Sequence, residues 1–583
     1  MEKDIKHFAA LYHHIKSLSE NGSFLNHKES DNWKTYSKAD FITTVRYLTL
    51  AFEAEGWRGK QIAIAIAPSS YWLLIDYALM LSGAVSVPLF TNISSKNLRF
   101  QISDADLHTV FTQTDEQEKI ILEADSTIRC IDIDTTDPNR KSLNSFINKG
   151  KKIDKGSPDK FDDLLSRITP DDLITIVYTS GTSGSPKGVE LTHFNLISQL
   201  NDTSLKYKLY GTTDKAMSLL PLAHIFERMV MHFYLSEGIS VYFADDVRNI
   251  GNLLREIHPT IMTVVPRLLE KVCFKMHQKA MSGNPVKKLI AMIAFQNAMH
   301  KEAYTPKSLV DKLMDKIVYQ KLRDSLGGKL RMMISGGAPL ANDLYRFFLN
   351  IGIPLYQGYG LTESSPVICA NAPGANKVGS CGQHFEHTEV KIDKNNELFA
   401  RGPGIMKRYH NNPKSTQETI DSEGWLRTGD LATMDDEGYI NITGRSKELS
   451  KTSTGEYIET HYIEHLLMVS GWFDHVLIVG NNRPFVTALL MTDATTVNEF
   501  AKKYSFEGTK KVVESKRFRA NMKRLIIKTN KKLNHWEKIR EFHLITETLS
   551  IENGDLTPSM KLARDHVENR FHDAIENMYK GHI

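Results

Sequence analysis

A loop rich in glycine and hydroxyl side chains carries the strongest chemical signal in this sequence. Residues 178–188 read Tyr-Thr-Ser-Gly-Thr-Ser-Gly-Ser-Pro-Lys-Gly and follow an apolar run, 173–177, that is typical of a buried strand. Glycine lets a backbone approach a bulky anion, while hydroxyls, backbone N–H groups and a lysine can bind phosphate oxygens. An ordinary turn seldom needs eleven such residues, so the segment predicts a polyphosphate-binding loop.

The loop differs from the Walker A motif, in which glycine, lysine and serine or threonine follow one another. Here Lys187 lies between Pro186 and Gly188. Four more motifs follow it: Tyr359-Gly-Leu-Thr-Glu363, Gly424-Trp-Leu-Arg-Thr-Gly-Asp430, Gly444-Arg-Ser-Lys-Glu448 and Thr557-Pro-Ser-Met-Lys-Leu-Ala-Arg564. In this order the five motifs resemble those of the acyl-adenylate-forming enzymes, which include acyl-CoA synthetases, firefly luciferase and the adenylation domains of peptide synthetases. The resemblance extends over roughly residues 40–565.

The resemblance implies an adenine nucleotide whose parts are held by separate segments. Small residues let a flat adenine ring approach the backbone, and Tyr359 is expected to stack on its other face. Asp430 is expected to bind the ribose hydroxyls with Arg445 as its helper, although a single aspartate could equally be a helix cap. Thr362 would touch the α-phosphate. The expected nucleotide-binding residues are Thr179, Ser180, Gly181, Thr182, Ser183, Gly184, Lys187, Gly336, Gly337, Ala338, Gln357, Gly358, Tyr359, Gly360, Thr362, Asp430, Arg445, Lys447 and Lys451.

The same resemblance implies a magnesium ion, because the carboxylate substrate and ATP repel each other and a metal offsets that charge. Glu363 offers the hard oxygen ligand that Mg²⁺ prefers, and Thr179 is the expected second metal contact. On the residues alone, segment 358–362 could be only a turn after a strand.

Three residues are expected to act on the reacting groups: Lys561, His224 and Arg445. Residues 221–228, Pro-Leu-Ala-His-Ile-Phe-Glu-Arg, resemble the segment that borders the family's carboxylate pocket. A lone histidine beside apolar residues is more often a core group, so His224 rests on that surrounding match. A carboxylate needs no deprotonation at neutral pH, so the histidine need not be a general base.

Lys561 is assigned by the resemblance alone, because its position far along the chain from the loop says nothing about catalysis. In the family, a small C-terminal domain brings this lysine to the α-phosphate for adenylation and then rotates away, with Lys447 at the pivot. Met560 departs from the family pattern, in which glycine is usual at this position.

The length of 583 residues is too great for one hydrophobic core. Between residues 40 and 280, helical stretches alternate with short β-rich runs, which predicts parallel sheets covered by helices. The polar segment 149–163 is interpreted as a linker. The fold class is α/β: an N-terminal domain, 1–445, with two parallel-rich α/β sheets plus a β-barrel, followed by a mobile α+β domain, 446–583.

The predicted function is that of an AMP-forming long-chain fatty acid–CoA ligase that uses ATP, Mg²⁺ and coenzyme A. Within the mostly helical stretch 274–329, residues 310–313 together with 321–328 are similar to an insertion in the long-chain branch. One alternative is an enzyme that loads the acyl group onto a carrier protein, because both thiols end in phosphopantetheine. A second is a catalytically silent lipid-binding relative, but Lys187, Glu363, Asp430 and Lys561 are all present. The basic tail lacks the interleaved aromatics typical of nucleic-acid binding.

The sequence predicts a cytoplasmic enzyme with weak contact at the inner face of an anionic membrane. The N-terminus has no apolar signal region, and the most apolar window, 71–89, reads as a buried helix and a strand. Residues 510–540 contain twelve Lys or Arg and two Asp or Glu. This basic stretch is either a solvated helix face or a surface for coenzyme A phosphates or anionic lipid. The Met- and Lys-bearing segment 281–321 is a second candidate.

Overall fold

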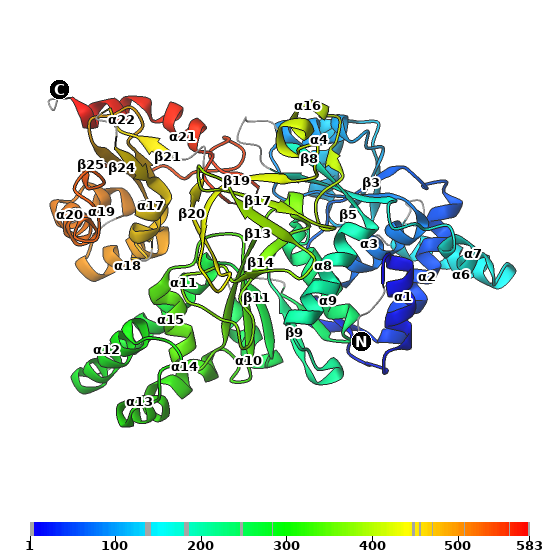
Figure 1. Ribbon diagram of the computed structural model, residues 1–583, viewed down its shortest axis with the longest axis horizontal. Helices are drawn as coiled ribbons and strands as arrows, with labels where there is room; N and C mark the ends of the chain where they lie inside the picture. The colour runs from blue at the N-terminus through cyan, green and yellow to red at the C-terminus, as the bar shows by residue number, and fades with distance from the viewer. Residues whose placement is uncertain are drawn as a thin grey trace.

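The computed structural model describes residues 5–133, 142–179, 186–244, 249–282, 284–445, 449–453, 456–468, 470–506, 508–558 and 560–580. Three sheets build the larger, N-terminal part. Two smaller sheets, of two and three strands, lie in residues 449–580, which gather on one side of the molecule (Figure 1). The mixed α/β class predicted from the alternating runs is confirmed.

The first sheet has nine strands, and its six central strands are parallel. Its order is β15-β14-β13-β12-β11-β9-β10-β1-β2, with antiparallel pairing only at β14, β15 and β2. The strands are β1 (Leu25–Glu29), β2 (Asn32–Tyr36), β9 (Lys215–Ser218), β10 (Ser240–Phe243), β11 (Ile261–Val264), β12 (Met332–Ser335), β13 (Leu355–Gly360), β14 (Val367–Ala370) and β15 (Gln383–His384).

The second sheet has seven strands in the order β18-β8-β7-β4-β3-β5-β6 and is parallel from β7 to β6. Strands β7 and β8 form an antiparallel hairpin in which Thr179 pairs with Lys187, so the glycine-rich loop connects the two. The strands are β3 (Gln61–Ile64), β4 (Val85–Pro88), β5 (Thr109–Thr112), β6 (Arg129–Asp132), β7 (Leu173–Thr179), β8 (Lys187–Thr192) and β18 (Arg408–Tyr409).

Two helices pack between these sheets, α3 (Ser70–Ser82) and α9 (Ile225–Ser236). Every residue of α3 is buried, and Gly83 ends it in the left-handed conformation that favours glycine, with φ of 77°. The helix and the following β4 match the prediction for the apolar window. No helix in the described ranges is long and apolar enough to cross a membrane.

A fully buried ion pair joins the two inner helices to the second sheet. The guanidinium of Arg228 on α9 donates to both carboxylate oxygens of Asp76 on α3, at 2.7 and 2.9 Å, and to Oγ1 of Thr175 on β7, at 2.7 Å. Burial alone would raise the pKa of Asp76, but the positive charge of Arg228, together with contacts from His232 and Ser86, outweighs it, and the pKa lies below its ordinary value. This pair fixes α9, whose N-cap is His224, relative to the strand that enters the glycine-rich loop.

The remaining helices of the N-terminal part pack on the sheets and on one another. They are α1 (Phe8–Ser17), α2 (Lys38–Ala54), α4 (Ser95–Asp104), α5 (Asp115–Ala124), α6 (Leu143–Gly156), α7 (Lys160–Leu165), α8 (His193–Lys206), α10 (Ile250–Ile257), α11 (Pro266–Ala280), α12 (Pro285–His300), α13 (Leu309–Met314), α14 (Gln320–Ser325), α15 (Asn342–Asn350) and α16 (Pro413–Thr419).

The linker predicted at 149–163 is wrong, because α6 and α7 occupy most of it. Helix α6 packs on α2, where a Cβ at Gly150 would lie 1.8 Å from the carbonyl oxygen of Tyr47. The side chain of Arg46 binds Asp154 at 2.7 Å. A polar sequence therefore forms a helix here because a narrow inner face, centred on glycine, fits a neighbouring helix.

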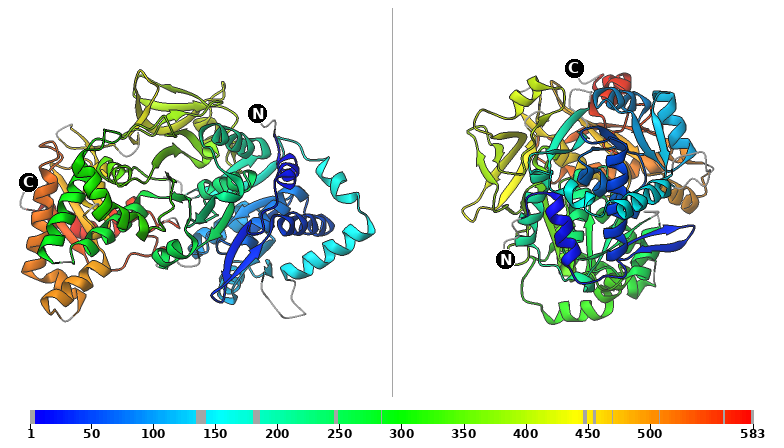
Figure 2. Two further views of the ribbon diagram at one scale, coloured as in Figure 1. Left: turned by 90° about the horizontal axis from the view of Figure 1, so that it is seen from below. Right: turned by 90° about the vertical axis from the view of Figure 1, so that its right-hand side faces the viewer.

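The third sheet is antiparallel and has four strands in the order β16-β17-β19-β20, and it stands out as a separate yellow-green layer in Figure 2. The predicted β-barrel is therefore an open sheet in the described residues, because its edge strands β16 and β20 do not pair with each other. The strands are β16 (Glu389–Ile392), β17 (Glu397–Arg401), β19 (Leu426–Met434) and β20 (Ile440–Arg445).

The C-terminal part has its own three-stranded sheet, β23-β24-β25, and its own apolar core. Its boundary at residues 445 and 446 stays a prediction, because residues 446–448 lie outside the described ranges. The elements are β21 (Leu449–Lys451), β22 (Tyr457–Glu459), α17 (Thr460–Met468), β23 (Phe473–Val479), β24 (Val486–Thr492), α18 (Ala494–Tyr504), α19 (Thr509–Glu514), α20 (Lys516–Asn530), β25 (Ile539–Ile545), α21 (Arg564–Arg570) and α22 (His572–Tyr579).

Candidate functional site

Three strands bring together the residues expected at the ribose. Asp430 on β19 pairs in register with Arg445 on β20, and Nε of Arg445 donates to Oδ1 of Asp430 at 2.9 Å. The hydroxyl of Tyr359, at the end of β13, donates to Oδ2 at 2.5 Å. Asp430 is only 3% exposed, and burial together with its negative charge raises the pKa of Tyr359. The carboxylate is thus held rigidly as an acceptor, which is the property a diol-binding residue needs.

We expect Asp430→Asn to raise the KM for ATP, because the neutral amide weakens both the contact with Arg445 and acceptance from a ribose. Hydrogen bonds to charged groups contribute about 1.5–3 kcal/mol, which corresponds to roughly a 10- to 150-fold change. Steady-state kinetics with varied ATP measures it. Asp435→Asn is the matched control, because Asp435 lies in the turn after the same strand and binds the exposed Lys377 at 2.7 Å. If both variants had the same KM for ATP, the assignment of Asp430 to the nucleotide site would be wrong.

Glu363 lies beside the base of the glycine-rich loop. Tyr409, which the sequence motifs did not predict, contacts both. The hydroxyl of Tyr409 donates to Oε1 of Glu363 at 2.7 Å, while Nζ of Lys187 lies 4.7 Å from the centre of the Tyr409 ring. Oγ1 of Thr179 donates to the carbonyl oxygen of Lys187 at 3.4 Å. Burial and the neighbouring carboxylate raise the pKa of Tyr409, so the hydroxyl stays protonated and donates. The expected metal and phosphate residues are therefore neighbours.

Tyr409 reaches this cluster through strand pairing. Its short strand β18 pairs with β8, with Tyr409 opposite Val189 and Arg408 opposite Glu190. Because this pairing joins segments far apart in the sequence, no local motif signals it. Residues 180–185 lie outside the described ranges, so the roles of Ser180, Gly181, Thr182, Ser183 and Gly184 stay predictions.

The segment expected at adenine leaves β12 as Gly336-Gly337-Ala338. A Cβ at Gly336 would lie 2.9 Å from Cζ of Phe226, which explains the glycine, and Gly337 has φ of 79°. On the neighbouring strand, a Cβ at Gly360 would lie 1.8 Å from the carbonyl oxygen of Pro366. Gln357 is buried, whereas Gly358, Tyr359, Gly360 and Thr362 are half-buried at the carboxyl end of β13.

Lys561 meets this segment across the two parts of the chain. Its Nζ donates to the carbonyl oxygen of Gly337 at 3.1 Å. The adjoining segment is held by a bond from Asn92 Nδ2 to the carbonyl oxygen of Pro558, at 3.2 Å. The C-terminal part is thus oriented with its lysine toward the expected adenine and phosphate segments.

The turn formed by residues 557–561, which we call the lysine turn, explains why glycine is usual at the position that Met560 occupies here. Within the turn, the N–H of Thr557 donates to the carbonyl oxygen of Lys561 at 2.8 Å. Met560 adopts φ of 62°, in the left-handed region, and is 53% exposed. A glycine is usual at this position because only glycine adopts that conformation without steric cost. The turn therefore keeps its shape with methionine.

His224 caps the start of α9 close to Lys561. Its Nδ1 accepts from the N–H of Phe226 at 3.4 Å, so the neutral ring carries its proton on Nε2. Burial and the positive charge of Lys561 lower the pKa of His224 to about 4. The histidine is uncharged at neutral pH and can donate a hydrogen bond to an anion, but it does not supply a positive charge.

One expected residue lies in the C-terminal part, and another lies outside the described part of the chain. Lys451 is on β21, where its carbonyl oxygen accepts from the N–H of Asn482 at 2.7 Å, and its predicted role in nucleotide binding stays a prediction. Lys447, the expected pivot, lies outside the described residues.

The donor set fits magnesium only together with a nucleotide. No group of three His, Cys, Asp or Glu that could hold a metal ion occurs in the part of the chain that the structure describes. Mg²⁺ typically binds one or two carboxylates and completes its shell with phosphate oxygens and water. Glu363 with the hydroxyl of Thr179 matches that pattern.

The chain belongs to the AMP-binding enzyme family. Residues 20–410 match the AMP-binding enzyme family, and residues 450–582 match the AMP-binding enzyme C-terminal domain. The resemblance drawn from the five motifs is confirmed. The chain is similar to long-chain-fatty-acid–CoA ligase FadD15 of Mycobacterium bovis, at 28% identity over 94% of this chain and 92% of the relative. Long-chain-fatty-acid–CoA ligase 1 of Homo sapiens is 27% identical over 96% of this chain and 85% of the relative.

Solved structures share the fold. The adenylation domain of a carboxylate reductase from Mycobacterium chelonae has a TM-score of 0.75 and 18% identity, covering 99% of this chain and 92% of that domain. The o-succinylbenzoate CoA synthetase of Bacillus subtilis, solved with ATP and a magnesium ion, has a TM-score of 0.64 and 18% identity, covering 95% and 98%. The predicted mixed α/β fold, with a large N-terminal domain and a smaller C-terminal domain, is thereby confirmed apart from the barrel.

Proposed function

We propose that this protein is an AMP-forming long-chain fatty acid–CoA ligase. It uses ATP, Mg²⁺ and coenzyme A. The fatty acid carboxylate attacks the α-phosphorus of ATP, which releases pyrophosphate and forms an acyl-adenylate. The thiol of coenzyme A then attacks the acyl carbon, which releases AMP. The family and the names of its relatives support the reaction class and the long-chain acid.

The observation that carries the proposal is the position of Lys561. This exposed cation comes from the C-terminal part and lies at the Gly337 carbonyl, beside the uncharged His224. A cation there can offset charge that develops on the α-phosphate, while Nε2–H of His224 can donate to the reacting oxygen. Glu363, through the metal it would hold, supplies charge neutralisation at the phosphates.

Release of AMP and pyrophosphate across saturated acids, from acetate to stearate, tests the chain-length part of the proposal. We expect the highest kcat/KM with acids of the long-chain class. A maximum at acetate or another short acid would contradict the long-chain assignment and leave acyl adenylation standing.

A carrier-protein acceptor is the second candidate. One similar solved structure is an adenylation–carrier didomain of a carboxylic acid reductase from Segniliparus rugosus, with a TM-score of 0.71 at 17% identity. Thioester formation on free coenzyme A and on a phosphopantetheinylated acyl carrier protein separates the two functions. We expect coenzyme A to be the faster acceptor, and a strong preference for the carrier protein would reverse the assignment.

Glu363→Gln is expected to raise the Mg²⁺ concentration needed for half-maximal activity by about tenfold or more. Glutamine keeps the size and the acceptor for Tyr409 but loses the charge that a hard cation requires. A magnesium titration of AMP release measures the shift. Tyr409→Phe is the matched variant, because it removes the hydrogen bond and keeps the carboxylate, and its shift should be smaller. Wild-type behaviour of Glu363→Gln across the titration would place the metal on another residue.

A further inference from the structure

The exposed apolar side chains of this protein are concentrated in one protruding segment. Nine of the sixteen large apolar residues that are exposed in the described part of the chain lie between residues 286 and 317. They are Val286, Leu289, Met292, Ile293, Tyr304, Leu309, Val310, Leu313 and Ile317. Helices α12 and α13, which carry most of them, project from the body (Figure 1). We call residues 285–321 the apolar–basic hairpin. Such a contiguous exposed set marks an interaction surface.

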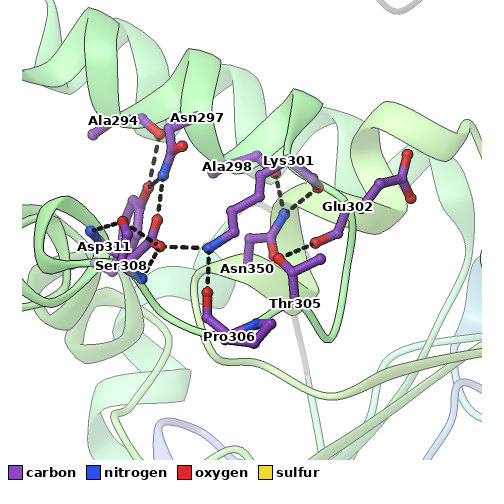
Figure 3. Close-up of polar contacts among 11 residues, drawn as sticks. Ala294, Asn297, Ala298, Lys301, Glu302, Thr305, Pro306, Ser308, Asp311 and Asn350 are labelled. Carbon is purple, nitrogen blue, oxygen red and sulfur yellow. Dashed lines mark hydrogen bonds and ion pairs between the residues drawn. The ribbon is translucent and has the colours of Figure 1, made fainter.

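A polar cluster fixes the shape of the hairpin. Asp311, at the start of α13, accepts from Nδ2 of Asn297 at 2.8 Å and from the ammonium group of Lys301, both in α12 or just beyond it (Figure 3). The carbonyl oxygens of Ala298 and Lys301 accept from Nδ2 of Asn350 on α15, at 2.9 and 2.8 Å. These bonds tie the two helices to each other and to the body.

Helix α12 has one closely packed, buried face and one face whose side chains are exposed. Ala294 and Ala298 are completely buried, and the ring of Phe295 stacks on Phe347 of α15 with their centres 5.1 Å apart. By contrast, Val286 and Leu289 on the same helix are 66% and 54% exposed. The exposed face is therefore a property of a fixed helix, because frayed ends would not bury the opposite side so completely.

The charge of the hairpin is strongly positive once its ion pairs are taken into account. Residues 284–321 contain seven lysines and three acids. Each acid binds a cation: Glu302 pairs with Arg346 at 2.9 Å, Asp315 with Arg323 at 2.7 Å, and Asp311 with Lys301. The six other lysines are all exposed: Lys287, Lys288, Lys307, Lys312, Lys316 and Lys321. Uncompensated positive charge thus surrounds the apolar side chains.

We propose that the apolar–basic hairpin docks the protein onto an anionic lipid bilayer. Apolar side chains of an amphipathic helix enter the headgroup region, while lysines reach outward to the lipid phosphates. At 16 residues, α12 is too short to cross a membrane, so it lies in the plane of the interface. Given the proposed function, this surface brings the enzyme to acids and thioesters that partition into lipid.

Charge complementarity favours the bilayer over a second copy of the chain. In a symmetric dimer through this face, the six exposed lysines of one copy would approach those of the other, which opposes association. The basic helix α20 is a poorer candidate. Among its described residues only Ile527 is a large exposed apolar side chain, and Phe518, Met522 and Ile526 are buried. Its lysines suit a solvated face.

Cosedimentation of the full chain with vesicles tests the proposal. Wild-type protein should bind phosphatidylcholine vesicles that contain phosphatidylglycerol, lose binding at high salt, and bind pure phosphatidylcholine poorly. A lysine near an anionic surface contributes about a fivefold change in binding, so Lys312→Gln with Lys316→Gln should weaken binding roughly 30-fold. Leu289→Gln with Leu309→Gln should weaken it about tenfold or more.

Two matched pairs serve as controls. Lys523→Gln with Lys528→Gln removes the same charge from α20, and Leu205→Gln with Ile527→Gln removes exposed apolar side chains elsewhere. Both should bind within about twofold of wild type, since neither pair touches the proposed surface. Loss of binding in the α20 pair with normal binding in both hairpin pairs would overturn the proposal.

Sedimentation velocity without lipid supplies the second readout. A wild-type dimer that Leu289→Gln with Leu309→Gln converts to a monomer would assign the face to self-association and overturn the proposal. The vesicle assay needs no substrate, so it separates this inference from the proposed function. Protein that binds vesicles through the hairpin yet releases no AMP with any acid would overturn the function and support the docking surface.

Discussion

Replacing Lys561 with alanine is expected to slow acyl-adenylate formation by about 10²–10³-fold, which corresponds to roughly 3–4 kcal/mol of transition-state stabilisation. The reason is the position of its ammonium group, which lies 3.1 Å from the Gly337 carbonyl oxygen in the present arrangement. A charge delivered by the C-terminal part stabilises only the step during which that part is docked. Thioester formation from a supplied acyl-adenylate should therefore continue at nearly the wild-type rate.

The two half-reactions are measured separately. Single-turnover release of pyrophosphate reports adenylation, and thioester formation from synthetic acyl-adenylate and coenzyme A reports the second step. Lys538→Ala serves as the control, because it removes an exposed lysine from the same part of the chain without touching the lysine turn. Equal losses in both half-reactions for Lys561→Ala would contradict a role confined to adenylation.

Replacing Arg228 with methionine is expected to reduce the free energy of unfolding by about 3–5 kcal/mol, because it leaves the Asp76 carboxylate buried without its cation. Both side chains of the pair are fully buried. The low pKa of Asp76 gives the pH dependence its sign. The stability that the pair supplies is present above the ordinary aspartate pKa and is lost as pH falls through the lower pKa of the folded state.

Urea denaturation of four proteins tests this prediction: the wild type, Arg228→Met, Asp76→Val and the double variant. The double variant should be more stable than either single variant, since removing both charges leaves no unpaired ion in the core. Additive losses in the double variant would show that the two side chains do not stabilise each other. Arg228→Met should also misplace His224, so its residual activity reports the coupling between α9 and the loop.

Much of the candidate site could be predicted because each of its parts is a short contiguous motif. Segments 359–363, 424–430 and 557–564 carry their chemistry in local residue types, and the structure brings Tyr359, Asp430 and Arg445 into hydrogen-bond contact. The strands were also predictable, since buried parallel strands are short apolar runs with little ambiguity. Runs 61–66, 85–88 and 109–112 contain β3, β4 and β5.

The missed features all depend on contacts between distant segments. Tyr409 contacts Glu363 because β18 pairs with β8, and no sequence motif around residue 409 predicts that pairing. The helix at 149–156 depends on the fit of Gly150 against Tyr47. The sheet β16-β17-β19-β20 would form a barrel only if its two edge strands paired with each other. The alternation of side chains along a strand does not predict that pairing.

The apolar–basic hairpin shows the same limit. Its composition favours a core helix over a lipid contact, because a Met-bearing helical face is more often buried. In the structure Ala294 and Phe295 are buried and Leu289 is exposed, so one face of the helix packs on the core and the other faces outward. Periodicity predicts that a helix has two faces, but only packing decides which of them the protein covers.

The central claim is that the chain passes an acyl group through an adenylate. Transfer of heavy oxygen from a labelled fatty acid tests it most directly. If the carboxylate attacks the α-phosphorus and the thiol then attacks the acyl carbon, the bridging oxygen leaves with AMP. We predict one labelled oxygen in AMP and none in pyrophosphate when the purified chain turns over ATP, Mg²⁺, coenzyme A and the labelled acid. Unlabelled AMP, or label in inorganic phosphate, would contradict the account.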